Sequence, residues 1–244
     1  MIFKDKLDIN QLFRDGYFET EIKPDLADRI YKTMLNEAWI ELKPEKKRAL
    51  DTSDKYYFKR HIAARSILKP TELHGTYAEF IEGFKRYAAP VLSAYYNGDD
   101  ALVTAYCGTD GYEMELHTDV SDRSVIDVIL YIGGETEAAN GKGGSLEIVK
   151  GSLKNYDYEE KQHLHSVKTT HGKVIILNNM LPNIYHGVPR LEAPGVKRFQ
   201  LVGNMGLPDS PKWSYETKNK IGMINPGRPV LLDDIESIIQ LMNE

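Results

Sequence analysis

Cysteine is nearly absent from this sequence, which contains Cys107 alone among its 244 residues. A single cysteine excludes an internal disulfide and every zinc site that needs several cysteines. A chain without disulfides fits a reducing compartment, and we expect a cytoplasmic location. Cys107 stands beside Gly108 in an apolar segment, so we expect its thiol to be a small buried group.

Long apolar runs are also missing. No segment approaches the roughly 18 consecutive apolar residues that a membrane-spanning helix requires, so we expect no membrane partner. The first residues of the chain, Met1–Lys6, show no basic segment that leads into an apolar one, and we expect no signal peptide.

Positive charge is in slight deficit, with 31 Lys and Arg against 36 Asp and Glu and a net charge of −5. This balance disfavours a nucleic-acid partner. Basic residues are closely spaced at 46–48 and 59–60, and we interpret them as a solvated face of the protein.

The remaining composition is that of an ordinary globular protein, with 41% hydrophobic and 27% charged residues. The length fits one large domain. We expect one compact domain with three regions: residues 1–100 as a helical region that supports the core and shapes access to a substrate, residues 101–206 as a β-rich core, and residues 207–244 as a C-terminal extension.

Two long helices are predicted in the first region, at Pro24–Trp39 and Thr71–Tyr95, because their apolar residues recur at helical spacing. The polar segment Pro44–Asp54 between them is predicted to be a loop. A short helix is expected at Asp233–Glu244, near the end of the chain.

After the turn signal Asn97–Asp100 the pattern changes to short β-rich segments that Gly and Asn residues separate. Eight short strands behind two helices favour a mainly β fold with α, a double-stranded β-helix (jelly roll) supported by N-terminal helices, over alternating βαβ units. The expected strands are Ala101–Cys107, Tyr112–Thr118, Val125–Ile132, Ser145–Val149, Leu164–Thr169, Lys173–Asn178, Ile184–Pro189 and Lys197–Met205.

The most informative motif is His117-Thr118-Asp119, with His186 far downstream. Alternate side chains of a strand share a face, so His117 and Asp119 can point at one spot while Thr118 points away. Two imidazoles and one carboxylate form the facial triad of non-haem Fe(II) oxygenases. The sequence therefore predicts a metal centre of His117, Asp119 and His186. Taken without His186, the first two residues also fit a polar pair on a barrel rim.

Further motifs occur in a fixed order over about the C-terminal half of the chain, which resembles the 2-oxoglutarate- and Fe(II)-dependent dioxygenases, particularly their prolyl 4-hydroxylase-like branch. A lone His-x-Asp is weak evidence, whereas the ordered set, which ends in a His and then a basic residue on the last strand, is specific. The matching motifs are Tyr106-Cys107-Gly108, Gly111-Tyr112, His117-Thr118-Asp119, Leu130-Tyr131-Ile132, Gly143-Gly144-Ser145-Leu146-Glu147, Gly172-Lys173-Val174-Ile175-Ile176-Leu177, Tyr185-His186-Gly187-Val188 and Lys197-Arg198-Phe199-Gln200-Leu201.

The resemblance implies Fe(II), 2-oxoglutarate as cosubstrate and O2, with ascorbate as an optional reductant. It implies that Arg198 binds the distal carboxylate of 2-oxoglutarate, which a planar guanidinium can grip through two parallel hydrogen bonds. Tyr131 matches the position that adds a donor at this end, and Tyr106 matches a position near the metal-proximal end.

Three other residues compete for roles around Arg198. Lys197 adjoins it, but alternation sends Lys197 to the opposite face. Arg190, soon after His186, is a second candidate cation, and we expect it to be an exposed loop charge or a substrate contact. Gln200 shares the predicted face of Arg198 and either contacts substrate or makes a structural hydrogen bond.

A second metal at His163, His165 and His171 would need a carboxylate or a further ligand that faces the same way, and the sequence offers no such context. We interpret them as surface or inter-sheet residues rather than as a second metal site.

We therefore expect a 2-oxoglutarate-dependent dioxygenase that hydroxylates an aliphatic C–H of an amino-acid side chain, free or peptidyl, with release of succinate and CO2. Asp119 favours hydroxylation, because halogenases of the superfamily replace this ligand with a small residue. The alternatives are desaturation or cyclisation of a small molecule, a non-catalytic jelly-roll module that binds metal or ligand, and a nucleic-acid demethylase.

Overall fold

The computed structural model describes residues 1–42, 45–47, 60–67, 75–95, 101–117, 126–133, 143–150, 163–179 and 184–205. None of the helices in these ranges is long and apolar enough to cross a membrane. The predicted C-terminal helix, Asp233–Glu244, and the rest of the extension lie outside the described residues.

The helices are α1 (Ile9–Asp15), α2 (Pro24–Leu35) and α3 (Thr76–Tyr95), and the strands are β1 (Tyr17–Glu21), β2 (Ile40–Leu42), β3 (Glu45–Lys47), β4 (Arg60–Ile67), β5 (Ala101–His117), β6 (Ile126–Ile132), β7 (Leu146–Lys150), β8 (His163–Val167), β9 (Lys173–Asn178), β10 (Ile184–Val188) and β11 (Arg198–Met205).

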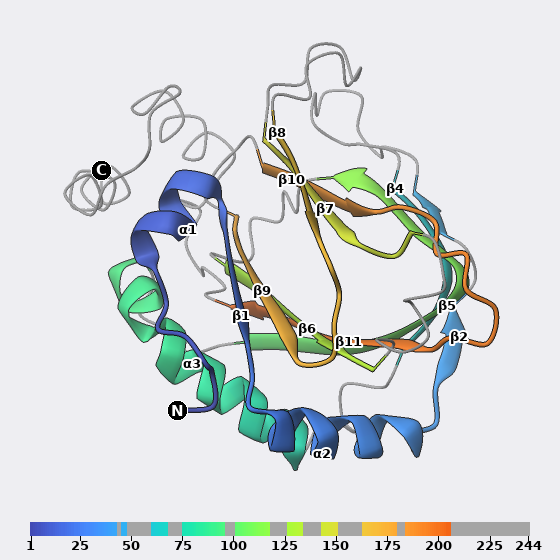
Figure 1. Cartoon of the computed structure of the whole chain (residues 1–244), viewed down its shortest axis with the longest axis horizontal. Helices are drawn as coiled ribbons and strands as arrows, with labels where there is room; N and C mark the ends of the chain where they lie inside the picture. Colours follow the sequence, from blue (N-terminus) through green and yellow to red (C-terminus); the bar gives the residue numbers. More distant parts are fainter. Residues whose placement is uncertain are drawn as a thin grey trace.

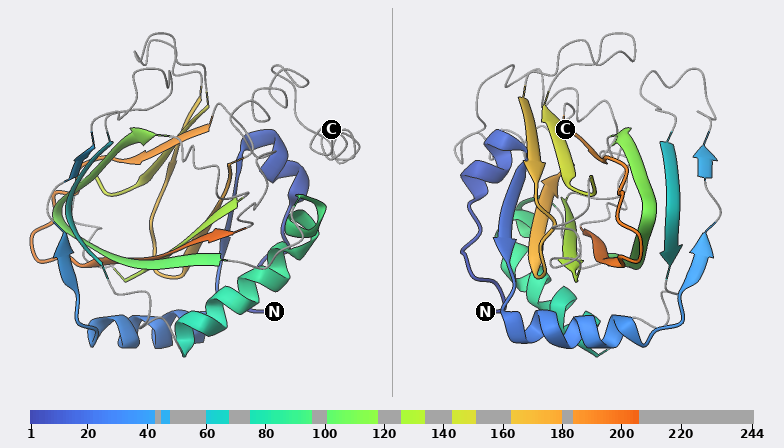
Figure 2. Two further views of the ribbon diagram at one scale, coloured as in Figure 1. Left: turned by 180° about the vertical axis from the view of Figure 1, so that it is seen from behind. Right: turned by 45° about the vertical axis from the view of Figure 1, so that its right-hand side comes forward.

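The strands form one curled antiparallel sheet in the order β1-β9-β6-β11-β5-β10-β7-β8, and β4 pairs with β5 and carries β2 and β3. Figure 1 shows two layers: β9, β6 and β11 lie in one, and β10, β7 and β8 lie in the other. Helices α2 and α3 run along the outer face of the first layer (Figure 2). The predicted jelly roll with N-terminal helices is confirmed.

Strand β5 belongs to both layers. Its first half, from Ala101 to Gly108, pairs with β11, and its last residues, from Met114 to His117, pair with β10. The sequence predicted two strands with a break at the glycines, and this is wrong: the strand bends there without ending. Gly111 supplies a φ of 82°, which residues with a Cβ adopt at a cost, and its N–H donates to the Leu191 carbonyl at 2.7 Å.

The first 100 residues contribute more sheet than the sequence predicted. Strand β1 pairs with β9 along its whole length, from Tyr17 opposite Leu177 to Glu21 opposite Lys173. Strand β3 lies inside the segment predicted as a loop and pairs with β4. That prediction is wrong for these residues, because a charged segment is compatible with a strand that pairs along one edge only.

Helix α2 ends at Leu35, earlier than the predicted Trp39. The side-chain amide of Asn36 donates to the Lys32 carbonyl at 2.7 Å, and the Trp39 indole donates to the Met34 carbonyl at 2.9 Å. Two side chains therefore donate to carbonyl groups of the last helical turn, where helical hydrogen bonding ends. One face of α3 belongs to the core, with Tyr77, Phe80, Ile81, Phe84 and Ala88 buried.

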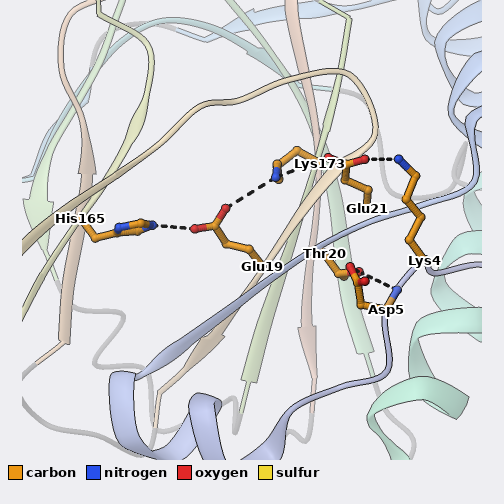
Figure 3. A network of polar contacts seen from close by, with 7 residues as sticks. All are labelled: Lys4, Asp5, Glu19, Thr20, Glu21, His165 and Lys173. Carbon is orange, nitrogen blue, oxygen red and sulfur yellow. Dashed lines mark hydrogen bonds and ion pairs between the residues drawn. The ribbon is translucent and has the colours of Figure 1, made fainter.

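Side chains join the two ends of the strand order. His165 of β8 lies 2.6 Å from the Glu19 carboxylate of β1, and its ring stacks on Tyr17 with centroids 4.8 Å apart. Nζ of Lys173 lies 3.6 Å from a carboxylate oxygen of Glu19 and 3.6 Å from one of Glu21, so a row of charged side chains follows β1 (Figure 3). Between β1 and β8, the two ends of the strand order in the described residues, a side-chain hydrogen bond and a ring stack thus close the roll.

Two glycines with positive φ allow the stability cost of backbone strain to be compared with that of overpacking. Gly16 (φ 85°) ends α1, and a Cβ there would overlap the Ile184 side chain, whereas a Cβ at Gly75 (φ 59°) would meet no atom of the described residues within 4 Å. We expect Gly75→Ala to lower the free energy of unfolding by about 1–2 kcal/mol through strain alone. Gly16→Ala should add a further loss of about 1–3 kcal/mol from overpacking.

Denaturant unfolding of the two variants measures this difference. Equal losses of stability would show that Ile184 moves aside at no cost and that the contact between α1 and β10 is loose.

Candidate active site

Arg198 is the first residue of β11 and lies on the inner face of the roll. Its neighbour Phe199 is buried on the helix-covered face, where its ring stacks on Trp39 with centroids 5.4 Å apart. Alternation therefore places Arg198 and Gln200 on the inner face. Arg198 is 3% exposed, whereas Lys197 is exposed to solvent. The prediction that Arg198 rather than Lys197 is the inward cation is confirmed.

The buried guanidinium has no hydrogen-bond partner among the described residues: Nε, Nη1 and Nη2 are all unsatisfied. The Tyr131 hydroxyl, also buried, lacks a partner in the same ranges. Burial raises the pKa of Tyr131 well above its ordinary value, although the nearby Arg198 opposes this shift, so the phenol stays protonated. The inner face thus presents buried N–H and O–H donors without an acceptor, which is a chemical match for an anion.

The other residues predicted around Arg198 fall in one row across three strands. The Cα of Gln200 lies opposite Tyr131 on β6 and opposite Tyr106 on β5. Gln200 is buried and Tyr106 is partly buried. Because directly opposite positions share a face of a sheet, these residues lie on the same inner face as Arg198.

A β-bulge sets the register of the two predicted histidine ligands. The Cα of His186 lies opposite that of His117, and the next pair is Val188 with Met114. His186 and Val188 are two positions apart while their partners are three apart, so β5 carries one extra residue. Without this residue, His117 and His186 would not stand directly opposite each other. His186 is 4% exposed.

The third predicted ligand, Asp119, lies outside the described residues, two positions after His117. Within the described ranges, no three His, Cys, Asp or Glu side chains form a group that could hold a metal. The structure therefore brings two of the three predicted ligand positions together in the backbone register.

The loop between β10 and β11 links His186 to Arg198 and is held along its length. The Leu191 N–H donates to the Tyr112 carbonyl at 2.8 Å, and the Ala193 N–H donates to Oδ1 of Asp110 at 2.8 Å. The Gly144 N–H donates to the Pro189 carbonyl at 3.0 Å. The loop is thus tied to the bend of β5 and to the segment just before β7.

Two glycines before β7 make room for this loop. A Cβ at Gly143 would overlap the Arg190 carbonyl, and a Cβ at Gly144 would lie 2.8 Å from Cδ1 of Leu191 and 3.3 Å from Nη1 of Arg198. The Gly143-Gly144 motif therefore permits a close backbone approach. The side chain of Arg190 itself is exposed.

The other histidines have structural partners. Besides the contact of His165 with the Glu19 carboxylate, Nδ1 of His171 accepts from the Gly133 N–H at 3.0 Å, and its Nε2 lies 3.2 Å from Oδ1 of Asp28. These contacts confirm the prediction for His165 and His171; nothing is described of the His163 side chain. Cys107 is buried as predicted, and burial raises the pKa of its thiol to about 11.

Sequence reasoning gave no role to three residues that line or shape the inner face. Tyr112 lies beneath the guanidinium of Arg198, and Gly108 leaves room for its ring. Asp127 is a buried carboxylate that shares the face of Tyr131 by alternation along β6. An acidic residue inside the apolar run 126–132 was the available signal for Asp127. The contact between Tyr112 and Arg198 joins different strands and leaves no local signal.

Comparison with known proteins gives a likeness of fold. No protein-family model matches the chain, and no curated protein matches it in sequence. Among solved structures, a prolyl-4-hydroxylase of Pseudomonas putida has a TM-score of 0.52 and 14% identity, covering 81% of this chain and 95% of that chain.

Two further structures are similar. A prolyl hydroxylase of Trichoplax adhaerens, in complex with a peptide fragment of the hypoxia-inducible factor oxygen degradation domain, has a TM-score of 0.55 and 13% identity over 81% of this chain and 86% of that one. HygX of Streptomyces hygroscopicus, with nickel, 2-oxoglutarate and hygromycin B bound, has a TM-score of 0.51 and 15% identity over 82% and 87%. The chain therefore has the fold of the 2-oxoglutarate- and Fe(II)-dependent oxygenases, including prolyl hydroxylases.

A buried guanidinium without an acceptor should destabilise the ligand-free protein. We expect Arg198→Met to raise the free energy of unfolding by about 1–4 kcal/mol, because a thioether of similar length removes the buried charge. Lys197→Met, at the exposed neighbouring position, should change stability by less than about 0.5 kcal/mol. Chemical denaturation in buffer without carboxylates measures both, and a destabilised Arg198→Met protein would mean that the guanidinium is already satisfied.

Proposed function

We propose that this chain is a 2-oxoglutarate-dependent Fe(II) dioxygenase that hydroxylates an aliphatic C–H of an amino-acid side chain, free or within a peptide, and releases succinate and CO2. The observation that carries the proposal is the guanidinium of Arg198, buried inside a jelly roll beside the Tyr131 hydroxyl, with neither group hydrogen-bonded to any described residue. A structural charge in such a position would be paired.

These donors fit one end of 2-oxoglutarate. The guanidinium can donate two parallel hydrogen bonds to the distal carboxylate, and the protonated phenol of Tyr131 can donate a third. Gln200 and Tyr106 continue the inner face from this point. The task of these side chains is to hold and orient the diacid in a site that excludes water.

The proposed ligands of the iron are His117, Asp119 and His186. Two imidazoles and one carboxylate leave open positions on an Fe(II) ion, and the opposed positions of His117 and His186 support a shared centre. Iron, 2-oxoglutarate and O2 together would supply the oxidising chemistry, while the chain supplies placement. The carboxylate of Asp119 would fill the position that a halide needs, so hydroxylation is the proposed outcome.

Two structures of this fold support a substrate that is either a peptide or a small molecule. The Trichoplax adhaerens enzyme holds a peptide fragment, and HygX holds hygromycin B. For this chain we propose an amino-acid side chain as the reacting group. Exposed Arg190 and buried Gln200 are the proposed substrate contacts.

Fe(II)-dependent formation of succinate from 2-oxoglutarate tests the proposal, in the presence of free amino acids and cell-extract peptides that are then searched for the gain of one oxygen atom. His117→Ala, Asp119→Ala and His186→Ala should each abolish succinate formation and lower the bound iron. His165→Ala, a histidine outside the proposed centre, should retain both. A wild-type protein that binds 2-oxoglutarate without forming succinate under any substrate would instead be a non-catalytic binding module.

The KM for 2-oxoglutarate distinguishes Arg198 from Arg190 as the residue that binds its distal carboxylate. Arg198→Ala should raise the KM for 2-oxoglutarate by about 10- to 150-fold, the range for losing hydrogen bonds to a charged group. Arg190→Ala, whose side chain is exposed, should change this KM by less than about twofold. The reverse ranking would assign the carboxylate to Arg190.

A further inference from the structure

Two aromatic rings hold the guanidinium of Arg198. Its Cζ lies 5.0 Å from the ring centroid of Tyr112 and 5.0 Å from that of Tyr131. Strand β11 lies between β5 and β6, so the rings come from strands on opposite sides of the arginine. A cation over an aromatic face within about 6 Å is attracted by the ring quadrupole, and the attraction strengthens when water is removed.

The ring of Tyr112 is itself fixed in place. A Cβ at position 108 would lie 2.9 Å from Cγ of Tyr112, so the ring occupies space that only a glycine leaves free. The Tyr112 carbonyl accepts from the Leu191 N–H, and the Gly111 N–H donates to the Leu191 carbonyl. Backbone bonds on one side and the absence of a side chain at Gly108 on the other hold the ring under Arg198.

Rings can fix the guanidinium without occupying its donors. An ion pair would consume the N–H groups that a ligand needs, whereas a ring contacts the face of the guanidinium and leaves its edges open. This explains how Arg198 stays buried although all three of its nitrogens are unsatisfied among the described residues. A side chain held in one orientation loses less conformational entropy when it binds a carboxylate.

We infer that Tyr112 is a positioning residue for diacid binding, which holds the plane of the Arg198 guanidinium and so fixes the length of diacid that the site accepts. The inference rests on the proposed function, because it takes the ligand of Arg198 to be 2-oxoglutarate. It assigns to Tyr112 an action through its ring and none through its hydroxyl.

Calorimetric binding of 2-oxoglutarate to protein loaded with Mn²⁺, which supports no turnover, measures the effect apart from activity. Tyr112→Leu should raise the Kd by about 2- to 30-fold, the range for losing one cation–π contact. Tyr112→Phe, which keeps the ring, should stay within about twofold of wild type. In the iron-loaded enzyme, Tyr112→Leu should raise the KM for 2-oxoglutarate more than it lowers kcat, and should reduce the preference for 2-oxoglutarate over the longer 2-oxoadipate.

Tyr31→Leu is the matched control, because Tyr31 contacts Phe199 on the other face of β11, with ring centroids 6.0 Å apart. It should lower the melting temperature and leave the Kd and the preference between diacids unchanged. Gly108→Ala, which displaces the Tyr112 ring, should weaken binding like Tyr112→Leu, and it decides the question alone if Tyr112→Leu does not fold.

Different results would contradict the proposed function and the role of Tyr112. A wild-type protein that does not bind 2-oxoglutarate overturns the proposed function and this role with it. Wild-type binding that Tyr112→Leu and Gly108→Ala leave unchanged overturns only the role of Tyr112. Equal weakening by Tyr112→Phe and Tyr112→Leu would also overturn it, since the hydroxyl would then be the acting group.

Discussion

The bend of β5 is the constraint on which the site depends. One continuous strand pairs with β11 in the first layer and with β10 in the second, so the same backbone sets the positions of Arg198 and His186. Gly111 permits the change of direction, and Leu191 is hydrogen-bonded to Gly111 and Tyr112 at the bend. The backbone therefore sets the separation between Arg198 and His186, and side-chain motion alters it little.

The fixed, buried position of Arg198 lowers the stability of the ligand-free protein. A desolvated cation normally needs a carboxylate or several carbonyl partners, and among the described residues this one has two tyrosine rings instead. The favourable ring contacts offset part of the lost hydration, while the edges of the guanidinium stay available. Folding thus holds a recognition group in its binding orientation before any ligand arrives, at the expense of stability in the free protein.

Local patterns predicted the parts of the fold that repeat. Alternation identified the β-rich core and placed Arg198 inward and Lys197 outward, and helical spacing identified the buried face of α3. Features that depend on distant partners were missed. Strand β1 reads as a charged segment until its pairing with β9 is known, and the glycines of β5 read as a break because Leu191, which stabilises the bend, lies far along the chain.

The candidate site likewise has features that the local sequence predicts and features that depend on distant partners. Residue types and their order pointed to His117, His186 and Arg198, since metal ligands and carboxylate binders are chemically distinctive. The bulge that sets His117 against His186 and the ring of Tyr112 under Arg198 are relations between strands, and neither leaves a mark in the neighbouring sequence.

The contact between His165 and Glu19 that closes the roll also bears on whether copies of the protein can pair through their sheet edges. Terminal strands of an open sheet expose unpaired N–H and C=O groups, which can recruit a strand from another molecule. Here residues near the N-terminus run beside the end of β1, where the Lys4 N–H donates to the Glu21 carbonyl at 2.8 Å. The Glu19 carboxylate on β1 contacts His165 on β8 and Lys173 on β9. A strand that pairs with β1 would have to displace the segment around Lys4 and desolvate the Glu19 carboxylate, so the contacts that complete the fold also protect it from edge-to-edge aggregation.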